Sequence, residues 1–100
     1  MFQVAPAELE ALINSLHYVK DVVVIPVLCD RAGEIPRAYV VPVDEATASE
    51  REQDILDHVH GKVSDHKQLR GGIRFVSEVP RSASGKLLRR VQVELDRAVQ

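Results

Sequence analysis

The sequence predicts an α+β domain in which a small antiparallel hairpin and a third short strand are packed by three helices, in the order αββαβα. Apolar residues recur at helical spacing in three segments, and β-branched residues gather in two runs. Turn-forming residues separate these segments. The chain has 100 residues, the usual size of one domain, so we treat residues 1–100 as a single domain.

The first helix is expected from Pro6 to about Leu16. Within it Leu9, Leu12 and Ile13 stand at positions i, i+3 and i+4, and Leu16 completes the pattern at i+7. Proline suits the first helical turn because the amide hydrogen it lacks has no partner there. The segment is therefore predicted to be an amphipathic helix.

The hairpin is expected from two β-branched runs, Val22–Leu28 and Ala38–Val43. Turn-forming and polar residues stand between them: Asp30, Gly33, Glu34 and Pro36. Pro26 and Pro42 lie inside the runs and cannot donate a ladder hydrogen bond. Both prolines are therefore predicted at strand ends, at bulges or on an outward-facing edge.

The second helix follows the hairpin, since Ser49 and Glu52 have the spacing of a capping box. Its apolar face comprises Ile55, Leu56, Val59 and Val63. Gly61 is either its terminator or a tolerated interior glycine. The polar and basic segment 64–72, closed by two glycines, is predicted to be a loop.

The third strand is expected over Ile73–Ser77, with Ile73 and Phe75 on one face, and Pro80 stops it. A final helix then shows an apolar side formed by Leu87, Leu88, Val91, Leu95 and Ala98. With three such helices and a sheet, every element is expected to bury its apolar face within this chain.

Composition argues against several classes of protein. The net charge of −2 and the aromatic content of 4% give the chain no basis for nucleic-acid binding, and no apolar run is long enough to span a membrane. Cys29 is the only cysteine, so no internal disulfide can form, and we expect a cytoplasmic protein. His58 and His60 stand two apart on a predicted helix and point to different sides, so no metal site is expected.

The segment from Pro80 to Arg90 is the best candidate for chemistry. Lys86 directly follows a loop of small residues and directly precedes a helix, a placement that can present its ammonium group to an outside partner. The alternative is that Lys86, Arg89 and Arg90 form only a solvated basic face. A phosphate-binding P-loop is excluded, because Pro80 and Leu87 occupy positions that require glycine and Ser or Thr.

Several stretches together resemble the C-terminal domain of acyl-CoA synthetases, 4-coumarate-CoA ligases and luciferases. The closing signature of that family is proline, a basic residue, serine, two spacers, glycine and lysine, and residues 80–86 match it. The other matching stretches keep their order and spacing, and the resemblance covers residues 2 to about 92: Gln3–Glu10, Asp21-Val22, Gly33–Pro36, Lys67–Gly72, Phe75-Val76 and Glu78–Pro80.

The resemblance implies an ATP-dependent, AMP-forming ligase whose large N-terminal adenylation domain lies outside this chain. Such an enzyme joins a small carboxylic acid to ATP with Mg²⁺, then transfers the acyl group to the thiol of coenzyme A or of a phosphopantetheine. It also implies that Lys86 is the adenylation lysine, with Gln3 and Gly85 near the nucleotide, and that Lys67, Gly71 and Gly72 belong to a loop on the thiol side.

Two alternatives come from other classes. A non-catalytic interaction module could retain this fold, although the presence of Gln3, Gly85 and Lys86 argues against it. A nucleic-acid binder could use the basic loops, but the negative net charge makes it a poor fit. In the ligase interpretation the chain is a moving lid, and the isolated chain is expected to be inactive.

Overall fold

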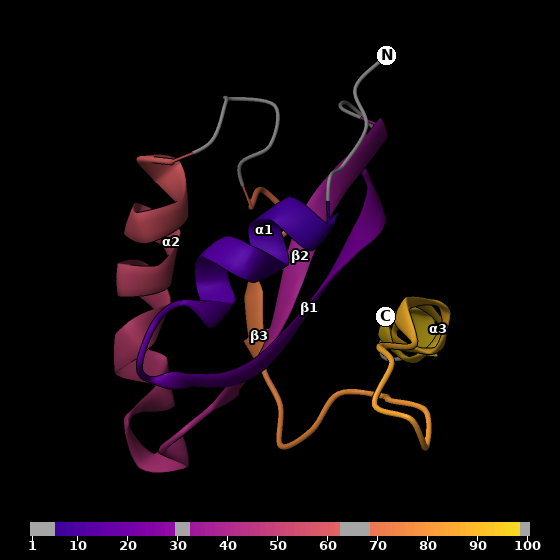
Figure 1. Cartoon of the computed structure of the whole chain (residues 1–100). Coiled ribbons are helices and arrows are strands. Elements are labelled where there is room, and N and C mark those ends of the chain that lie inside the picture. Colours follow the sequence, from indigo (N-terminus) through magenta and orange to yellow (C-terminus); the bar gives the residue numbers. More distant parts are fainter. Residues whose placement is uncertain (1–5, 30–32, 63–68, 99–100) are drawn as a thin grey trace.

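The computed structural model describes residues 6–29, 33–62 and 69–98, and it confirms the α+β class and the element order (Figure 1). A short 3₁₀ helix, η1, is added between the second strand and the second helix. The elements in chain order are α1 Pro6–Asn14, β1 Val19–Cys29, β2 Gly33–Pro42, η1 Glu45–Arg51, α2 Glu52–His60, β3 Ile73–Phe75 and α3 Arg89–Ala98.

The sheet has the order β1-β2-β3. β1 and β2 form the predicted antiparallel hairpin, with longer strands than the two β-branched runs. β3 is parallel to β2, an arrangement that needs a crossover connection, and η1 with α2 supplies it. Pro42 ends β2 and Pro26 lies within the edge strand β1, as predicted.

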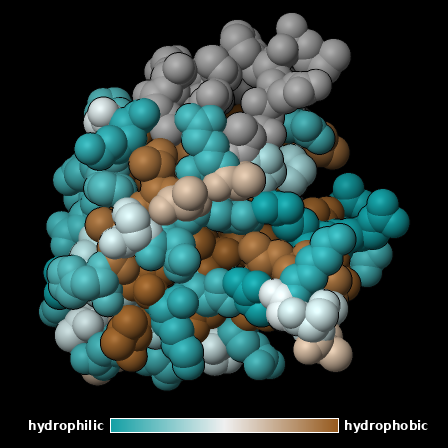
Figure 2. Space-filling view, viewed as in Figure 1, coloured by the Kyte–Doolittle hydropathy of each residue, from teal (hydrophilic) through white to brown (hydrophobic). Residues whose placement is uncertain are grey.

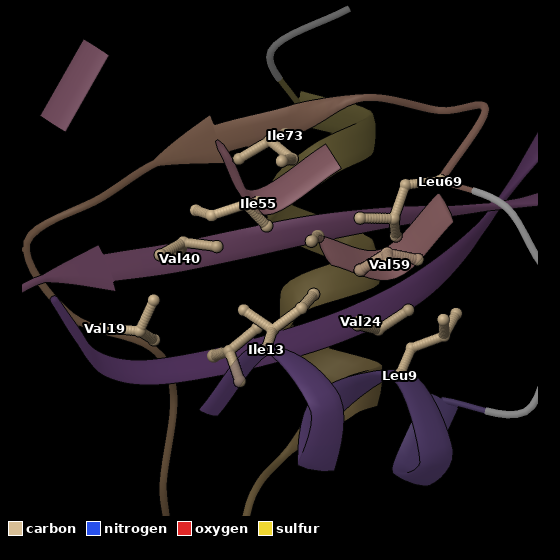
Figure 3. Close-up of a cluster of buried hydrophobic side chains, with 11 residues drawn as sticks. Leu9, Ile13, Val19, Val24, Val40, Ile55, Val59, Leu69 and Ile73 are labelled. Atoms are coloured by element: carbon tan, nitrogen blue, oxygen red, sulfur yellow. The ribbon is translucent and has the colours of Figure 1, made fainter. Parts of the chain in front are cut away.

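The sheet is buried on both faces because β1 alternates between two hydrophobic cores. Val22 and Val24 point into a core beneath α1 and α2, whereas Val23 and Ile25 point into a second core on the side of α3. Figure 3 shows the first core, where side chains from both helices meet those of the strands. A strand covered on both faces is expected to be apolar throughout, as the run from 22 to 25 is.

The predicted cap of the second helix is wrong. Ser49 lies inside η1, and the chain is already helical from Glu45. Asp44 caps η1, since its carboxylate accepts a hydrogen bond from the Ala46 amide at 3.0 Å, whereas α2 follows η1 directly and its N-cap residue, Arg51, makes no side-chain cap hydrogen bond. Gly61 does end α2, and its amide donates to the Asp57 carbonyl at 3.2 Å.

The prediction that the last helix buries its apolar side is also wrong. Val91 and Leu95 are 40% and 51% exposed, whereas Gln92 and Asp96 are 4% and 3% exposed. The side of α3 that faces the sheet is therefore shifted by about one sequence position from the apolar side of the helix. The expectation that every element buries its apolar face within this chain does not hold for α3.

Polar contacts explain this orientation of α3. At its first residue, the Arg89 guanidinium forms an ion pair with Glu10 of α1. Near its end, Asp96 accepts hydrogen bonds from Tyr39 and Arg37 of β2, the latter at 2.6 Å. Buried charges must be paired, so these partners determine which side of α3 faces the sheet.

The apolar side of α3 borders an open groove of about 600 Å³. Its apolar lining residues are Val91 and Leu95 of α3 together with Val41 and Val79. On the side of the molecule seen in Figure 2, hydrophobic residues lie across the middle and hydrophilic residues surround them. None of the helices in the described ranges combines the length and apolarity that a bilayer crossing demands.

Candidate active-site lysine loop

Lys86 is exposed in the segment between β3 and α3, where the chain folds back on itself (Figure 1). Arg81 and Leu87 form an antiparallel bridge, and the Leu88 amide donates to the Pro80 carbonyl at 3.0 Å. We call residues 80–88 the lysine loop. Its two ends are thus paired as in a very short hairpin, with Lys86 on one arm.

A tight turn closes the lysine loop. The Gly85 amide donates to the Ser82 carbonyl at 2.9 Å, and Gly85 has a φ of +89°. Only glycine adopts that backbone conformation without strain, which gives Gly85 a structural reason for standing before Lys86. The Lys86 carbonyl in turn accepts from the Ser82 amide at 2.9 Å.

Arg81 attaches the lysine loop to the sheet. Its Nε and Nη2 donate to the two carboxylate oxygens of Asp21 on β1, at 2.8 and 2.6 Å. Its Nη1 donates to the Gly85 carbonyl at 2.5 Å. The hydrogen bonds from Arg81 lower the pKa of Asp21 below its usual value, and the same pairing raises the pKa of Arg81.

A second ion pair holds the chain beyond the lysine loop. Glu10 accepts from the Arg89 Nε at 3.0 Å and from the Val24 amide of β1 at 2.8 Å. Leu87, between the two arginines, is half-buried and packs against the second core. Lys86 is therefore flanked on both sides by residues that are fixed to the body of the domain.

The Lys86 ammonium group makes no ion pair with any other residue in the described ranges. This agrees with the expectation that the lysine is exposed and available to an outside partner. An ammonium group whose backbone is fixed, and whose charge is not paired with a carboxylate of the described residues, can neutralise an anion that an outside partner brings to it.

The glycine loop, residues 69–72, packs against β2. The Gly71 amide donates to the Pro36 carbonyl at 2.9 Å, and the Arg37 Nε donates to the Gly71 carbonyl at 2.8 Å. Gly72 has a φ of +85° and accepts from the Ala38 amide at 3.1 Å. Both glycines are therefore needed by the local backbone, whatever else the loop does.

The two candidate loops lie apart. Gly71 contacts Pro36, which pairs with Pro26, whereas Arg81 contacts Asp21 near the other end of β1. From 21 to 26 is five strand positions, or about 17 Å. The structure does not bring Gly85 and Lys86 together with Gly71 and Gly72, and Gln3 and Lys67 lie outside the described residues.

The ion pairs that hold the lysine loop were not assigned a role from the sequence. Asp21 and Arg81 are 60 positions apart, and Glu10 and Arg89 are 79 apart, so no local spacing connects them. The one available signal is Asp21 itself, a carboxylate directly before the apolar run that begins at Val22. Such a residue needs a partner, but the sequence does not say which.

The fold and the lysine loop define a small α+β domain that presents one lysine. Residues 8–86 match the AMP-binding enzyme C-terminal domain, and the chain belongs to this family. It is 48% identical over 90 residues to 4-coumarate--CoA ligase-like 1 of Arabidopsis thaliana, covering 90% of this chain and 16% of that protein. It is 45% identical over 89 residues to probable 4-coumarate--CoA ligase 1 of Dictyostelium discoideum, covering 89% of this chain and 16% of that protein.

Solved structures show the same relationship. The fatty acyl CoA synthetase of Mycobacterium tuberculosis superposes with a TM-score of 0.84 and 32% identity, covering 96% of this chain and 18% of that one. The o-succinylbenzoate CoA synthetase of Bacillus subtilis, in complex with its acyl-adenylate intermediate, gives a TM-score of 0.74 and 28% identity, covering 87% and 17%. The chain thus spans less than a fifth of the length of these relatives.

Proposed function

We propose that this chain is the C-terminal lid domain of an ATP-dependent, AMP-forming carboxylic acid ligase, and that Lys86 is its adenylation lysine. The observation that carries the proposal is the placement of Lys86. Its ammonium group is exposed and without an ion pair in the described ranges, while the backbone around it is fixed to the sheet. Its relatives are named as CoA ligases and CoA synthetases.

The proposed reaction has two steps. In the first, a carboxylate oxygen attacks the α-phosphate of ATP, which gives an acyl-adenylate and releases pyrophosphate. In the second, a thiol attacks the acyl carbon, which gives a thioester and releases AMP. Lys86 acts in the first step, where its charge stabilises the negative charge that accumulates around the α-phosphate.

The partners follow from this proposal. The large adenylation domain would hold the small carboxylic acid and ATP with its Mg²⁺, an ion that binds substrate phosphates together with one or two carboxylates. Gln3 and Gly85 would lie near the nucleotide, and Lys67, Gly71 and Gly72 near the thiol of coenzyme A or of a phosphopantetheine. A single cysteine fits a cytoplasmic enzyme.

The distance between the two loops supports a lid that works in two orientations. A rigid domain in a single orientation would not bring two loops that lie about 17 Å apart to one reaction centre. If the lysine loop serves adenylation and the glycine loop serves thiol transfer, the domain has to rotate between the steps. Closure by such a domain completes the active site and excludes water, so the isolated chain would be inactive.

The proposal is tested in the intact ligase with Lys86→Ala. We expect acyl-adenylate formation, measured by pyrophosphate exchange, to slow by ~10²-fold or more, because one preorganised charge donor is lost. Thioester formation from preformed acyl-adenylate should be affected much less. Lys62→Ala, which removes an exposed lysine just past the end of α2, is the matched control and should change neither rate.

Two outcomes would contradict the proposal. Equal losses in both steps would mean that Lys86 does not act specifically in adenylation. No loss in either step would favour the alternative, a non-catalytic interaction module that retains this fold.

A further inference from the structure

The hydrogen bonds around Lys86 single out one peptide group, the one that joins Gly85 to Lys86. Its carbonyl oxygen accepts from the Nη1 of Arg81 at 2.5 Å, and its amide, on Lys86, donates to the Oγ of Ser82 at 3.1 Å. Both polar atoms of this peptide are therefore held by side chains. The Lys86 carbonyl on the other side of the Cα atom is also held, by the Ser82 amide at 2.9 Å. With the peptides on both sides held, the direction in which the Lys86 side chain leaves the backbone is fixed.

Asp21 binds the guanidinium group of Arg81, which in turn binds this peptide. It uses both carboxylate oxygens on Arg81, at 2.8 and 2.6 Å, and its Oδ1 also accepts from the Val22 amide at 2.9 Å. β1 in turn pairs with β2 continuously from Asp21 to Cys29, after a register shift between Val19 and Asp21. The position of β1 thus determines the position of the Lys86 peptide, through the contacts of Asp21 and Arg81.

The guanidinium group suits this connection better than an ammonium group would. Three of its N–H donors lie in one plane and face two acceptors, the Asp21 carboxylate and the Gly85 carbonyl. A planar, bidentate donor fixes a direction as well as a distance, whereas the ammonium group of lysine fixes only a position.

We propose that Asp21 and Arg81 are positioning residues for the proposed reaction: together they aim Lys86, and they act only through it. This inference rests on the proposed function. Neither residue needs to touch a substrate. The cost of losing them would be a misdirected ammonium group, and displacement of a catalytic group by about 1 Å can reduce a rate by ~10²-fold.

The test is a double-mutant cycle in the intact ligase, with pyrophosphate exchange at saturating substrates as the measurement. Asp21→Asn should lower kcat for adenylation about tenfold in the native background, and it should leave the KM for ATP almost unchanged. In the Lys86→Ala background the same substitution should have no further effect. When two residues act as one unit, removing the second after the first costs no further activity.

Two comparisons separate aiming from stability. Asp54→Asn breaks the ion pair with Arg51, which joins η1 to α2 away from the lysine loop, and it should leave adenylation unchanged. Asp21→Glu, which keeps a carboxylate that can accept from Arg81, should lose less of the rate than Asp21→Asn does. If Asp21→Asn fails to fold, Arg81→Lys replaces it, since it keeps the charge but loses the planar set of donors.

The outcomes distinguish this inference from the function on which it rests. If Lys86→Ala leaves adenylation unchanged, the proposed function fails. If Lys86→Ala slows adenylation but Asp21→Asn costs nothing, or costs the same factor in both backgrounds, then the aiming role is wrong while the function stands.

Discussion

Gly71 is the residue at which the backbone leaves least room for a side chain. A Cβ atom there would lie 2.8 Å from the Pro36 carbonyl oxygen and 3.0 Å from the Cβ of Arg37. Contact with backbone cannot be relieved by the rotation of a flexible side chain. The glycine loop therefore packs closely against β2, and this packing requires a glycine at position 71.

Gly71→Ala should destabilise this chain by about 1–3 kcal/mol, the usual cost of forcing extra atoms into a packed site. The free energy of unfolding from urea titration measures it. Gly61→Ala is the matched control, because Gly61 has a helical backbone and its new Cβ would meet only the Asp57 carbonyl, at 3.8 Å. That variant should be neutral or slightly stabilising. Equal losses at the two glycines would refute the packing explanation.

α3 is held to the domain by charges at its two ends more than by its apolar side. Arg89 pairs with Glu10 at the start, and Asp96 bonds to Arg37 and Tyr39 near the end. Burial alone would raise the pKa of Asp96, but the hydrogen bonds from Tyr39 and Arg37 outweigh it and hold that pKa below its ordinary value. The carboxylate is therefore ionised at neutral pH, where it holds α3 against β2.

This arrangement predicts opposite results for two neighbouring residues of α3. Asp96→Ala should cost about 3 kcal/mol, because Arg37 and Tyr39 would be left without their shared partner. Leu95→Ala should cost less than about 1 kcal/mol, since Leu95 is 51% exposed. Thermal or urea unfolding of the two variants provides the comparison. A larger loss at Leu95 would mean that the apolar side is the one that holds the helix.

At the scale of the whole molecule, the described ion pairs join segments that are far apart in the chain. Asp21 and Asp96 both have a pKa below the ordinary value of 3.8, through their bonds to Arg81 and to Tyr39 and Arg37. A carboxylate whose pKa is lower in the folded state stabilises the fold when it is ionised. That stabilisation is present above about pH 4 and is lost as the pH falls through the folded-state pKa.

The free energy of unfolding should therefore decrease as the pH is lowered from 5 to about 2. Asp96→Asn should flatten this decrease, because it removes one of the two carboxylates in the described ranges whose pKa is lowered in the folded state. At alkaline pH the dependence has the opposite sign. Burial raises the pKa of Tyr39 above 10.0, so the free energy of unfolding should also fall as the pH rises through the folded-state pKa of Tyr39. Denaturant titrations across pH measure both limbs. A stability that rises between pH 5 and 2 would rule out the ion-pair account.

The sequence by itself determined the features that depend on neighbouring residues. The helical spacing at Leu9 and Ile13, the apolar run that became β1 and the placement of Lys86 after a small-residue loop are all local patterns, and each corresponds to an observed element. Local patterns are reliable because backbone conformation is set mainly by residues a few positions away. The order αββαβα could be predicted for that reason, while the role of Lys86 stays a prediction.

Tertiary structure alone decided the features that depend on distant partners. Nothing local shows that β3 runs parallel to β2, that Asp21 binds Arg81 or that α3 turns Asp96 inward instead of Leu95. Periodicity shows that a helix has an apolar side, but the side that is buried depends on which groups face it in the fold. For α3, Arg37 and Tyr39 bind the buried carboxylate of Asp96, and Glu10 binds Arg89. These contacts outweigh the exposure of two apolar side chains.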